Sequence, residues 1–206
     1  MDIIKIANII KENGGTLHLV GGALRDELMG KEAHDKDYVV VGISKEKFME
    51  LFPNSHIRGK DFEVFDINRT EFALARMERK VGIGHKEFEI KTNKEITIEE
   101  DLERRDITIN AIAKNVLTEE IIDPFNGIDD IKNKIIKATT NAFKEDPLRV
   151  YRVARIAANT KFKVCDNTLK LMESLKDELT SLSKKEYFKN SKGGWKQINH
   201  QYFLMY

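Results

Sequence analysis

The sequence predicts an α+β protein in which residues 1–140 form a domain of mixed sheet and helices and residues 141–190 form an all-α segment. Two observations predict this division. In the first part, short apolar runs bounded by glycine alternate with helical patterns, whereas only apolar residues at helical spacing follow Pro147. Residues 191–206 are aromatic and polar without a clear period, and we assign them no structure.

Hydrophobic periodicity locates the elements of the first domain. Apolar residues at helical spacing predict helices, and β-branched runs bounded by glycine predict strands. The pair Gly14-Gly15 ends the first helix, and Gly21-Gly22 is a tight turn between the first strand and the second helix. In chain order we expect a helix over 2–13, a strand over 16–20, helices over 23–29 and 44–51 with a strand over 38–41 between them, and strands over 62–66, 71–78 and 87–92.

From Thr97 onward the pattern favours helices. Thr97 and Glu100 have the spacing of a capping box, and residues 107–113 carry an apolar helical face. The later elements are short strands over 121–123 and 135–138 and then, beyond Pro147, helices alone.

Composition restricts the class of protein. The 206 residues are 41% hydrophobic and 33% charged, which is a globular balance. Thirty-five basic against 34 acidic residues give a formal net charge of +1, so any binding to nucleic acid or anionic lipid must be local. A single cysteine excludes an intramolecular disulfide and a cysteine-cluster zinc site. Apolar stretches are short and interrupted by charge, so we expect a cytoplasmic protein that does not bind membranes.

Two aspartates lead directly into the expected strand over 38–41. Asp35 and Asp37 are two residues apart, a spacing at which strand side chains project from the same face. Paired carboxylates repel each other unless a cation neutralises them, and few oxygen ligands with open water positions suit Mg²⁺. Alone the motif is weak, because Asp-x-Asp is also common on solvated loops.

A glycine turn precedes these aspartates. Gly21 and Gly22 stand between a strand and a helix, where bare backbone can approach a phosphate at the helix N-terminus, and Arg25 lies in the first turn of that helix. A paired glycine is more often simply a turn. Glycine turn, arginine and paired aspartates together form a pattern that suits a nucleoside triphosphate and its metal.

Four segments occur in a fixed order along the chain. They are Leu19 to Asp26 with Asp35 to Val40, Glu103 to Ala113, Ile122 to Gly127, and Glu145 to Arg155. Together they resemble the motifs of class II tRNA nucleotidyltransferases, the CCA-adding enzymes and related bacterial poly(A) polymerases. The spacing is most similar to that of the bacterial multifunctional CCA proteins.

The resemblance implies a polymerase-beta-like nucleotidyltransferase head followed by a helical, base-selecting neck. It implies an enzyme that adds C and A to the 3′ end of tRNA, using CTP and ATP with Mg²⁺. Poly(A) polymerase, an A-only or CC-only adding enzyme, and a truncated homologue that binds nucleotides or RNA with little turnover remain as alternatives. Family members continue into helices that hold tRNA, which leaves open whether a homodimer or a missing C-terminal domain supplies that grip here.

The remaining candidate residues have side chains that suit nucleotide recognition. Arg105 can contact triphosphate oxygens, Asp106 can accept from a ribose hydroxyl, and Asn110 lies one turn further along. Without the other motifs, an ion pair on a helix surface would explain the pair of arginines there. Glu71 and Glu78 could each supply a third carboxylate, but a charged strand face explains both more simply, and we leave them out of the predicted site.

The last segment offers an acceptor beside a donor. Asp146 and Arg149 are three apart and are expected to share a helix face. Cytosine and adenine both present an amino donor beside a ring-nitrogen acceptor, so this pair could accept CTP and ATP and reject UTP and GTP. Arg152 and Arg155 continue the same face toward phosphates, although an ordinary helical salt bridge is the simpler explanation of Asp146 and Arg149 taken alone.

Overall fold

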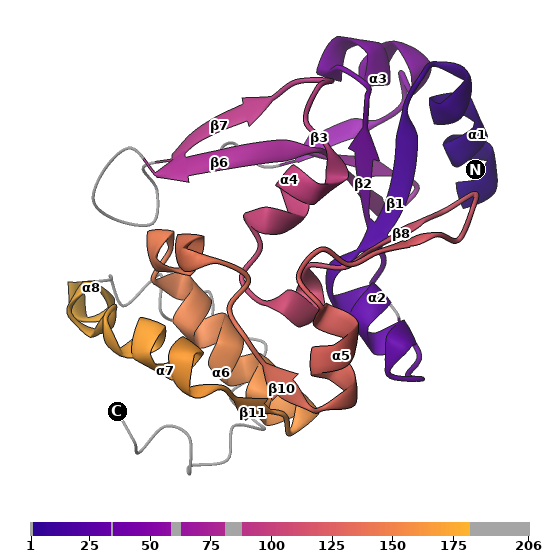
Figure 1. Ribbon diagram of the computed structural model, residues 1–206. Helices are drawn as coiled ribbons and strands as arrows, with labels where there is room; N and C mark the ends of the chain where they lie inside the picture. Colours follow the sequence, from indigo (N-terminus) through magenta and orange to yellow (C-terminus); the bar gives the residue numbers. More distant parts are fainter. Residues whose placement is uncertain (1, 34, 59–62, 81–87, 182–206) are drawn as a thin grey trace.

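The computed structural model describes residues 2–33, 35–58, 63–80 and 88–181. Its centre is a seven-stranded sheet in the order β3-β4-β5-β2-β1-β8-β9 (Figure 1). β2 and β5 run parallel and the other neighbours in this sheet run antiparallel, so the sheet is mixed, as predicted. Its strands are β1 (Thr16–Val20), β2 (Asp37–Val41), β3 (His56–Arg58), β4 (Val64–Ile67), β5 (Thr70–Leu74), β8 (Ala113–Asn115) and β9 (Ile121–Ile122).

Helices and two small strand pairs complete the described fold. β6 (Arg76–Lys80) and β7 (Phe88–Thr92) form an antiparallel ribbon, and β10 (Ile135–Ile136) pairs in parallel with β11 (Lys163–Val164). The helices are α1 (Ile3–Glu12), α2 (Gly21–Leu28), α3 (Lys45–Leu51), α4 (Ile98–Glu103), α5 (Gly127–Lys132), α6 (Leu148–Thr160), α7 (Asp166–Glu173) and α8 (Lys176–Ser181), with 3₁₀ turns η1 (Thr108–Asn110) and η2 (Asn141–Glu145).

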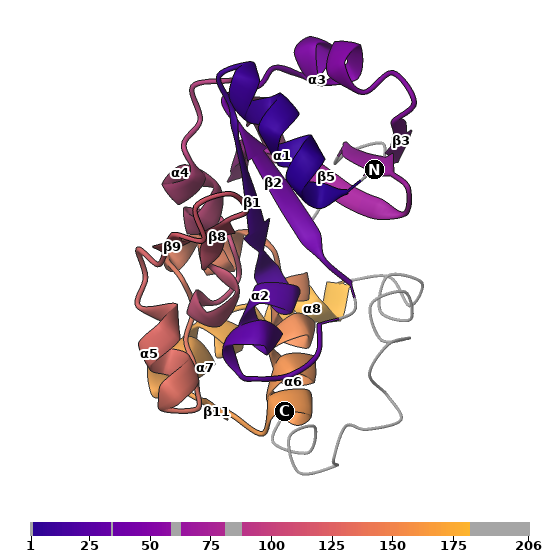
Figure 2. The same cartoon turned by 90° about the vertical axis from the view of Figure 1, so that its right-hand side faces the viewer.

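Side chains of the central strands alternate between two apolar cores. Tyr38 and Val40 belong to the core that α1 and α3 cover, whereas Val39 belongs to a second core with α4. Figure 2 shows α1 across one face of β1 and β2, with α4 on the opposite side. Both faces of the sheet centre are therefore covered, and the ends of β1 and β2 remain for a site.

Several predicted elements are confirmed within one or two residues. These are the first helix, the strands over 16–20 and 38–41, the helix over 44–51, and the short strands over 121–123 and 135–138. The Thr97 side chain accepts from the Glu100 backbone N–H, and the Glu100 carboxylate accepts from the Thr97 N–H, so the capping box is confirmed. For these elements, the residue pattern within each segment was sufficient to predict the secondary structure.

Other predictions were wrong where pairing with distant segments decides the backbone. Residues 107–113 form the short 3₁₀ helix η1 and the start of β8 rather than one continuous α-helix, because Thr108 N–H donates to the Lys137 carbonyl and β8 pairs with β1. The single strand over 71–78 breaks after Leu74: the Ala75 N–H still bonds to Val40, but the Arg76 N–H turns to the Asp101 carboxylate at 3.3 Å.

Two further boundaries differ from the sequence prediction. α2 starts at Gly21 instead of residue 23, because the left-handed φ of 71° at Gly21 turns the chain from β1 directly into the helix. The segment after Pro147 is not wholly helical, because β11 separates α6 from α7 by pairing with β10. The predicted all-α segment beyond residue 181 and the unassigned residues 191–206 lie outside the described residues.

The helical segment is joined to the first domain by backbone pairing. Cys165 N–H donates to the Ile136 carbonyl at 3.0 Å, and Lys163 N–H donates to the Lys134 carbonyl at 2.9 Å. Buried Thr168 accepts from the Ala138 N–H at 2.8 Å. These bonds cross the proposed boundary at residue 140, which stays a prediction.

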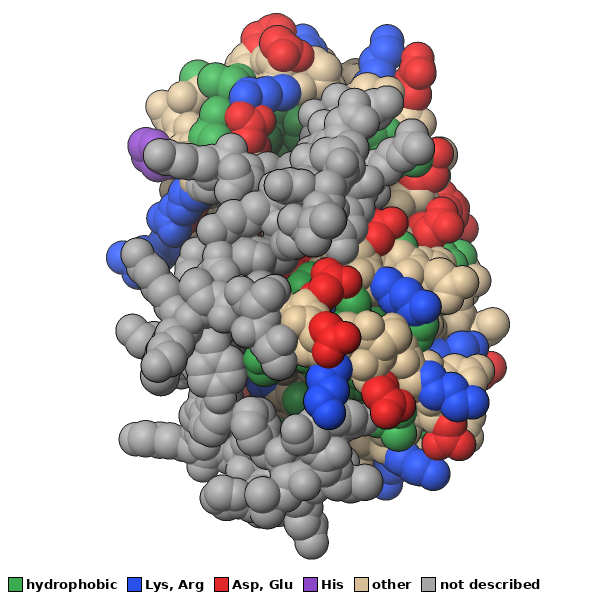
Figure 3. All heavy atoms as spheres, turned by 90° about the vertical axis from the view of Figure 1, so that its left-hand side faces the viewer, with side chains coloured by type: hydrophobic (Ala, Val, Ile, Leu, Met, Phe, Trp, Pro, Cys, Tyr) green, Lys and Arg blue, Asp and Glu red, His purple; other side chains and the backbone are tan. Residues whose placement is uncertain are grey.

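Surface charge and helix length agree with the balanced composition. Figure 3 shows Lys and Arg side chains interspersed with Asp and Glu on the described surface of one face, as the formal net charge of +1 suggests. Among the described helices, none is long and apolar enough to cross a membrane.

The contact of α5 with η1 leads to the first testable prediction. A Cβ on Gly127 would lie 2.3 Å from the Thr108 carbonyl oxygen, so Gly127→Ala should force the backbone apart and cost about 2–3 kcal/mol of unfolding free energy. Gly30→Ala is the control, because Gly30 has a φ of 70° but open space around it, and only the strain of about 1 kcal/mol is expected. Urea denaturation measures both, and equal losses would contradict the packing argument.

Candidate active site

The bend between β1 and α2 brings backbone close to an arginine. At Gly21 a Cβ would lie 3.4 Å from Nη1 of Arg105, and at Gly22 it would lie 3.6 Å from Nη2 of Arg25. The guanidinium groups of Arg105 and Arg25 therefore lie against the backbone at the helix N-terminus. Backbone N–H groups and arginines together favour an anionic ligand there.

A cavity of about 540 Å³ opens at this bend. We call it the arginine cavity, because Arg76, Arg104, Arg105, Arg149 and Arg152 line it. Nine of the twelve predicted site residues also line it: Gly21, Gly22, Asp37, Arg105, Asp106, Asn110, Asp146, Arg149 and Arg152. The sheet, the segment after α4 and the helix α6 thus contribute side chains to one place.

The carboxylates lie at the edge of this cavity. Asp37 begins β2 and stands directly opposite Glu71 on the parallel strand β5, and both residues line the arginine cavity. Both also line a neighbouring cavity of about 570 Å³, where Asp35 lies with them. Parallel register thus places Glu71, which the sequence analysis set aside, beside the predicted pair.

The electrostatics of Asp37 suit a cation. Partial removal from water and the negative charge of Glu71 raise the pKa of Asp37, while Arg105 opposes the rise and Asp35 adds to it. Among the described residues no three acidic, His or Cys side chains are close enough to bind a metal on their own. Mg²⁺ fits such a site, because it commonly takes one or two carboxylates together with water and substrate phosphates.

A hydrogen-bonded chain connects α2, η1 and α6. Arg25 donates from Nη1 to the Asn110 side-chain oxygen at 2.8 Å, and Asn110 donates in turn to the buried Asp106 carboxylate at 3.3 Å. Arg152 on α6 donates to the other oxygen of Asp106 at 2.8 Å. Burial would raise the pKa of Asp106, but the Arg152 charge and these hydrogen bonds outweigh it and lower the pKa.

Arg149, the other arginine of α6 that lines the cavity, donates hydrogen bonds to two backbone carbonyl groups. Arg149 is 6% exposed and donates from Nη1 to the Ala142 carbonyl at 3.0 Å and from Nη2 to the Arg104 carbonyl at 2.7 Å. Asp146 is not on the same helix, contrary to prediction. It has an extended backbone before α6, and its carboxylate accepts from the Leu148 N–H at 2.9 Å, so it caps the first turn instead of sharing a helix face with Arg149.

Arg105 is anchored by a residue that the sequence analysis missed. Nη2 of Arg105 donates to Oδ2 of Asp101 at 2.9 Å. Asp101 precedes Arg104 and Arg105 by three and four residues, and this helical spacing was the signal that could have identified it. Two other predicted residues, Arg25 and Arg155, do not line the arginine cavity. Arg25 lies beside Gly22. Burial and the nearby positive charge of Arg152 lower the pKa of Arg155.

Together, the mixed sheet, the glycine bend and the carboxylates beside the arginine cavity define the nucleotidyltransferase fold class. Residues 17–137 match the family described as the poly A polymerase head domain. Because the match covers more than half of the chain, the chain belongs to this family.

Curated relatives extend the similarity beyond the head. The chain is 43% identical over 195 residues to the multifunctional CCA protein of Psychromonas ingrahamii, covering 91% of this chain and 47% of that protein. It is 48% identical over 160 residues to the corresponding protein of Nitrosospira multiformis, covering 77% of this chain and 38% of that protein. The chain thus spans about half the length, or less, of the curated relatives it matches.

Solved structures show the same fold. The CCA-adding enzyme of Bacillus stearothermophilus in complex with CTP superposes with a TM-score of 0.75 at 26% identity, covering 91% of this chain and 46% of that one. A tRNA nucleotidyltransferase complexed with a primer tRNA and an incoming ATP analog gives 0.64 at 33% identity, covering 84% and 50%.

Asp101 predicts a pH dependence of stability. Its carboxyl is fully buried, which by itself raises the pKa, but Arg104 and Arg105 lower it from 3.8 to about 2. The folded state therefore gains about 2 kcal/mol above pH 4 that is lost as the pH falls through about 2. Chemical denaturation at pH 5 and pH 2.5 should show that the free energy of unfolding falls less on acidification in Asp101→Asn than in the wild type. Equal decreases in the two proteins would contradict a lowered pKa at Asp101.

Proposed function

We propose that this chain is the catalytic part of an RNA nucleotidyltransferase that adds C and A to the 3′ end of tRNA, using CTP, ATP and Mg²⁺. The observation that carries the proposal is the arginine cavity. It joins Gly21, Asp37 and Arg105 of the head to Arg149 and Arg152 of α6. Relatives named multifunctional CCA proteins, and a CCA-adding enzyme solved with CTP, support this substrate class.

Transfer of a nucleotide needs an aligned α-phosphate and compensation of charge on the departing pyrophosphate. Asp35 and Asp37 would hold Mg²⁺, with Glu71 beside them. When bound, the metal supplies charge neutralisation and activation of the attacking hydroxyl. Arg105 orients triphosphate oxygens against the bare backbone at Gly21, where its Nη1 lies closest.

The ribose side of the arginine cavity is formed by Asn110, Asp106 and Arg152, which are connected by hydrogen bonds. Asp106 is buried and accepts from the Ile107 N–H at 3.0 Å as well as from Asn110 and Arg152. We infer that Asp106 and Asn110 recognise the ribose hydroxyls as one rigid group. Arg152, whose side chain is 50% exposed, faces the phosphates, with Arg155 further along α6.

Base selection is assigned to Asp146 and Arg149. Asp146 offers acceptor oxygens and Arg149 offers N–H donors, a combination that matches the amino donor and ring-nitrogen acceptor of cytosine and adenine. Backbone groups orient both side chains: the Leu148 N–H for Asp146 and two carbonyls for Arg149. A template made of such fixed groups rejects UTP and GTP, whose edges leave its donors and acceptors unpaired.

The direct test is incorporation of each labelled nucleotide into tRNA that lacks its terminal CCA. Addition of two C residues and one A, resolved on a sequencing gel, is the expected outcome. A ladder of A residues would identify a poly(A) polymerase. Binding of CTP without incorporation would identify a nucleotide-binding homologue.

The carboxylates lead to a prediction about rate. Asp35→Ala and Asp37→Ala should each lower incorporation by at least about 1,000-fold, because metal binding supplies several kcal/mol of transition-state stabilisation. Both aspartates lie outside the two apolar cores, so the thermal midpoint should barely change. Asp129→Ala on α5, which removes an exposed ion pair with Lys132, is the control. Wild-type turnover in either cavity variant, with Mg²⁺ as the only metal, would refute the assignment.

Asp146 and Arg149 lead to a prediction about selectivity. Asp146→Ala should lower the preference for CTP and ATP over UTP and GTP by about 5- to 150-fold, since an unpaired buried polar group costs about 1–3 kcal/mol. Triphosphate affinity should change less. Ratios of kcat/KM for the four nucleotides measure this within each variant. Unchanged ratios in both Asp146→Ala and Arg149→Ala would show that other groups read the base.

A further inference from the structure

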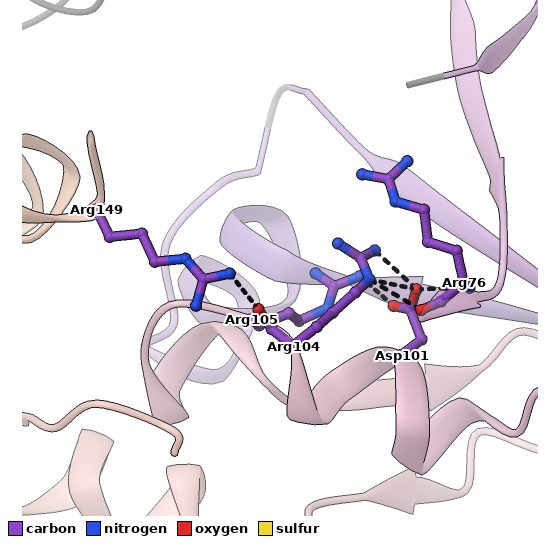
Figure 4. Close-up of polar contacts among 5 residues, drawn as sticks. All are labelled: Arg76, Asp101, Arg104, Arg105 and Arg149. Carbon is purple, nitrogen blue, oxygen red and sulfur yellow. Dashed lines mark hydrogen bonds and ion pairs between the residues drawn. The ribbon is translucent and has the colours of Figure 1, made fainter. Parts of the chain in front are cut away.

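The buried carboxylate of Asp101 is bonded to two arginines that line the arginine cavity. Asp101 is fully buried near the end of α4, and Figure 4 shows the side chains of Arg104 and Arg105 converging on it. Its Oδ1 accepts from Nε and Nη2 of Arg104 at 3.1 and 2.7 Å and from the Arg76 backbone N–H at 3.3 Å. Its Oδ2 accepts from Nη2 of Arg105 at 2.9 Å. Both oxygens are therefore used to orient neighbouring groups.

One oxygen fixes Arg105. Among the described residues, Asp101 is the hydrogen-bond partner of the Arg105 guanidinium, and the buried Nε atom has no partner there. The contact engages Nη2, and Nη1 then lies beside Gly21. Anchoring one end of a planar guanidinium sets the direction of its remaining N–H groups. Oδ2 of Asp101 thus orients Arg105 toward the glycine bend.

The other oxygen fixes the turn that receives Arg149. Arg104 bonds through its side chain to Asp101 and to the Arg76 carbonyl at 3.1 Å. This clamp holds the backbone of Arg104, whose carbonyl oxygen accepts from Arg149 at 2.7 Å. Figure 4 shows Arg149 reaching that carbonyl from the opposite side of the cluster. Hydrogen bonds through Arg104 therefore connect Asp101 to Arg149, the arginine that we assign to base recognition.

Stability alone explains this arrangement poorly. The attraction within a buried ion pair is largely offset by the cost of removing both charges from water, and apolar residues of similar size stabilise a core equally well. Only 15% and 16% of the side-chain surfaces of Arg104 and Arg105 are exposed to solvent. Removing these two charges from water therefore has a substantial free-energy cost. Orientation of two guanidinium groups is a property that an apolar replacement cannot supply.

We propose that Asp101 is a positioning residue for nucleotide recognition, which orients Arg105 for the triphosphate directly and Arg149 for the base through the backbone of Arg104. The proposal rests on the proposed function only in taking this cavity as the nucleotide site. Asp101 itself does not line the arginine cavity. Its effect should therefore appear in nucleotide affinity and in base preference together.

The test measures CTP and UTP binding to the full chain by calorimetry, with Mg²⁺ and without RNA. Asp101→Asn keeps the shape of the side chain but removes its charge, and we expect at least tenfold weaker CTP binding and a smaller ratio of CTP to UTP affinity. Asp123→Asn is the matched control, because Asp123 accepts from the Gly127 and Ile128 N–H groups of α5 and lies outside the arginine cavity. CTP affinity within twofold of the wild type in folded Asp101→Asn would overturn the proposal.

A second variant and a mutant cycle keep the test decisive. If Asp101→Asn does not fold, Asp101→Glu keeps the charge but displaces it by one methylene, and wild-type affinities in that variant would equally overturn the proposal. Losses in Arg105→Ala and Asp101→Asn should not multiply in the double variant, because Asp101 acts partly through Arg105. If the double variant lost CTP affinity by the full product of the two single losses, Asp101 would not act through Arg105. A chain whose CTP binding depends on Asp101 but which incorporates nothing would contradict the proposed function alone.

Discussion

Repulsion between arginines is the constraint on which the site depends. Five arginines line one cavity of about 540 Å³, and like charges brought together disfavour the compact state unless acceptors compensate them. Asp101 holds two of them, Asp106 holds Arg152, and the carbonyls of Ala142 and Arg104 hold Arg149. These acceptors come from α4, from the chain beside η1, and from η2. Meeting the constraint therefore fixes how the sheet, the segment after α4 and the helix α6 are arranged.

Local chemistry made much of this fold predictable from the sequence. The strand over 38–41 is β-branched and apolar, and it was placed within one residue. The capping box at Thr97 was found from spacing alone. The nucleotide motifs were predicted as a set because glycines, arginines and carboxylates in this order suit one kind of ligand, and nine of the twelve residues line one cavity.

Contacts between distant segments account for what was missed. Nothing near Arg76 predicts that the strand breaks there, because the cause is the Asp101 carboxylate 25 positions further along. Glu71 was set aside because a charged strand face explained it more simply; its position beside Asp37 depends on parallel register, which sequence spacing does not show. Asp146 was placed on a helix that begins two residues later, because Pro147 acts as the N-cap and leaves Asp146 extended.

The pairing of β10 with β11 has a mechanical consequence. Backbone bonds from Ile136 and Lys134, together with Thr168, attach α6 and α7 to the sheet domain by interactions that a hinge would have to break. We therefore expect the sheet domain and the helices α6 and α7 to unfold in one cooperative transition and to move together as one rigid body. Under the function proposed above, choice between nucleotides would then depend on fit to a rigid template and not on movement of α6 against the sheet.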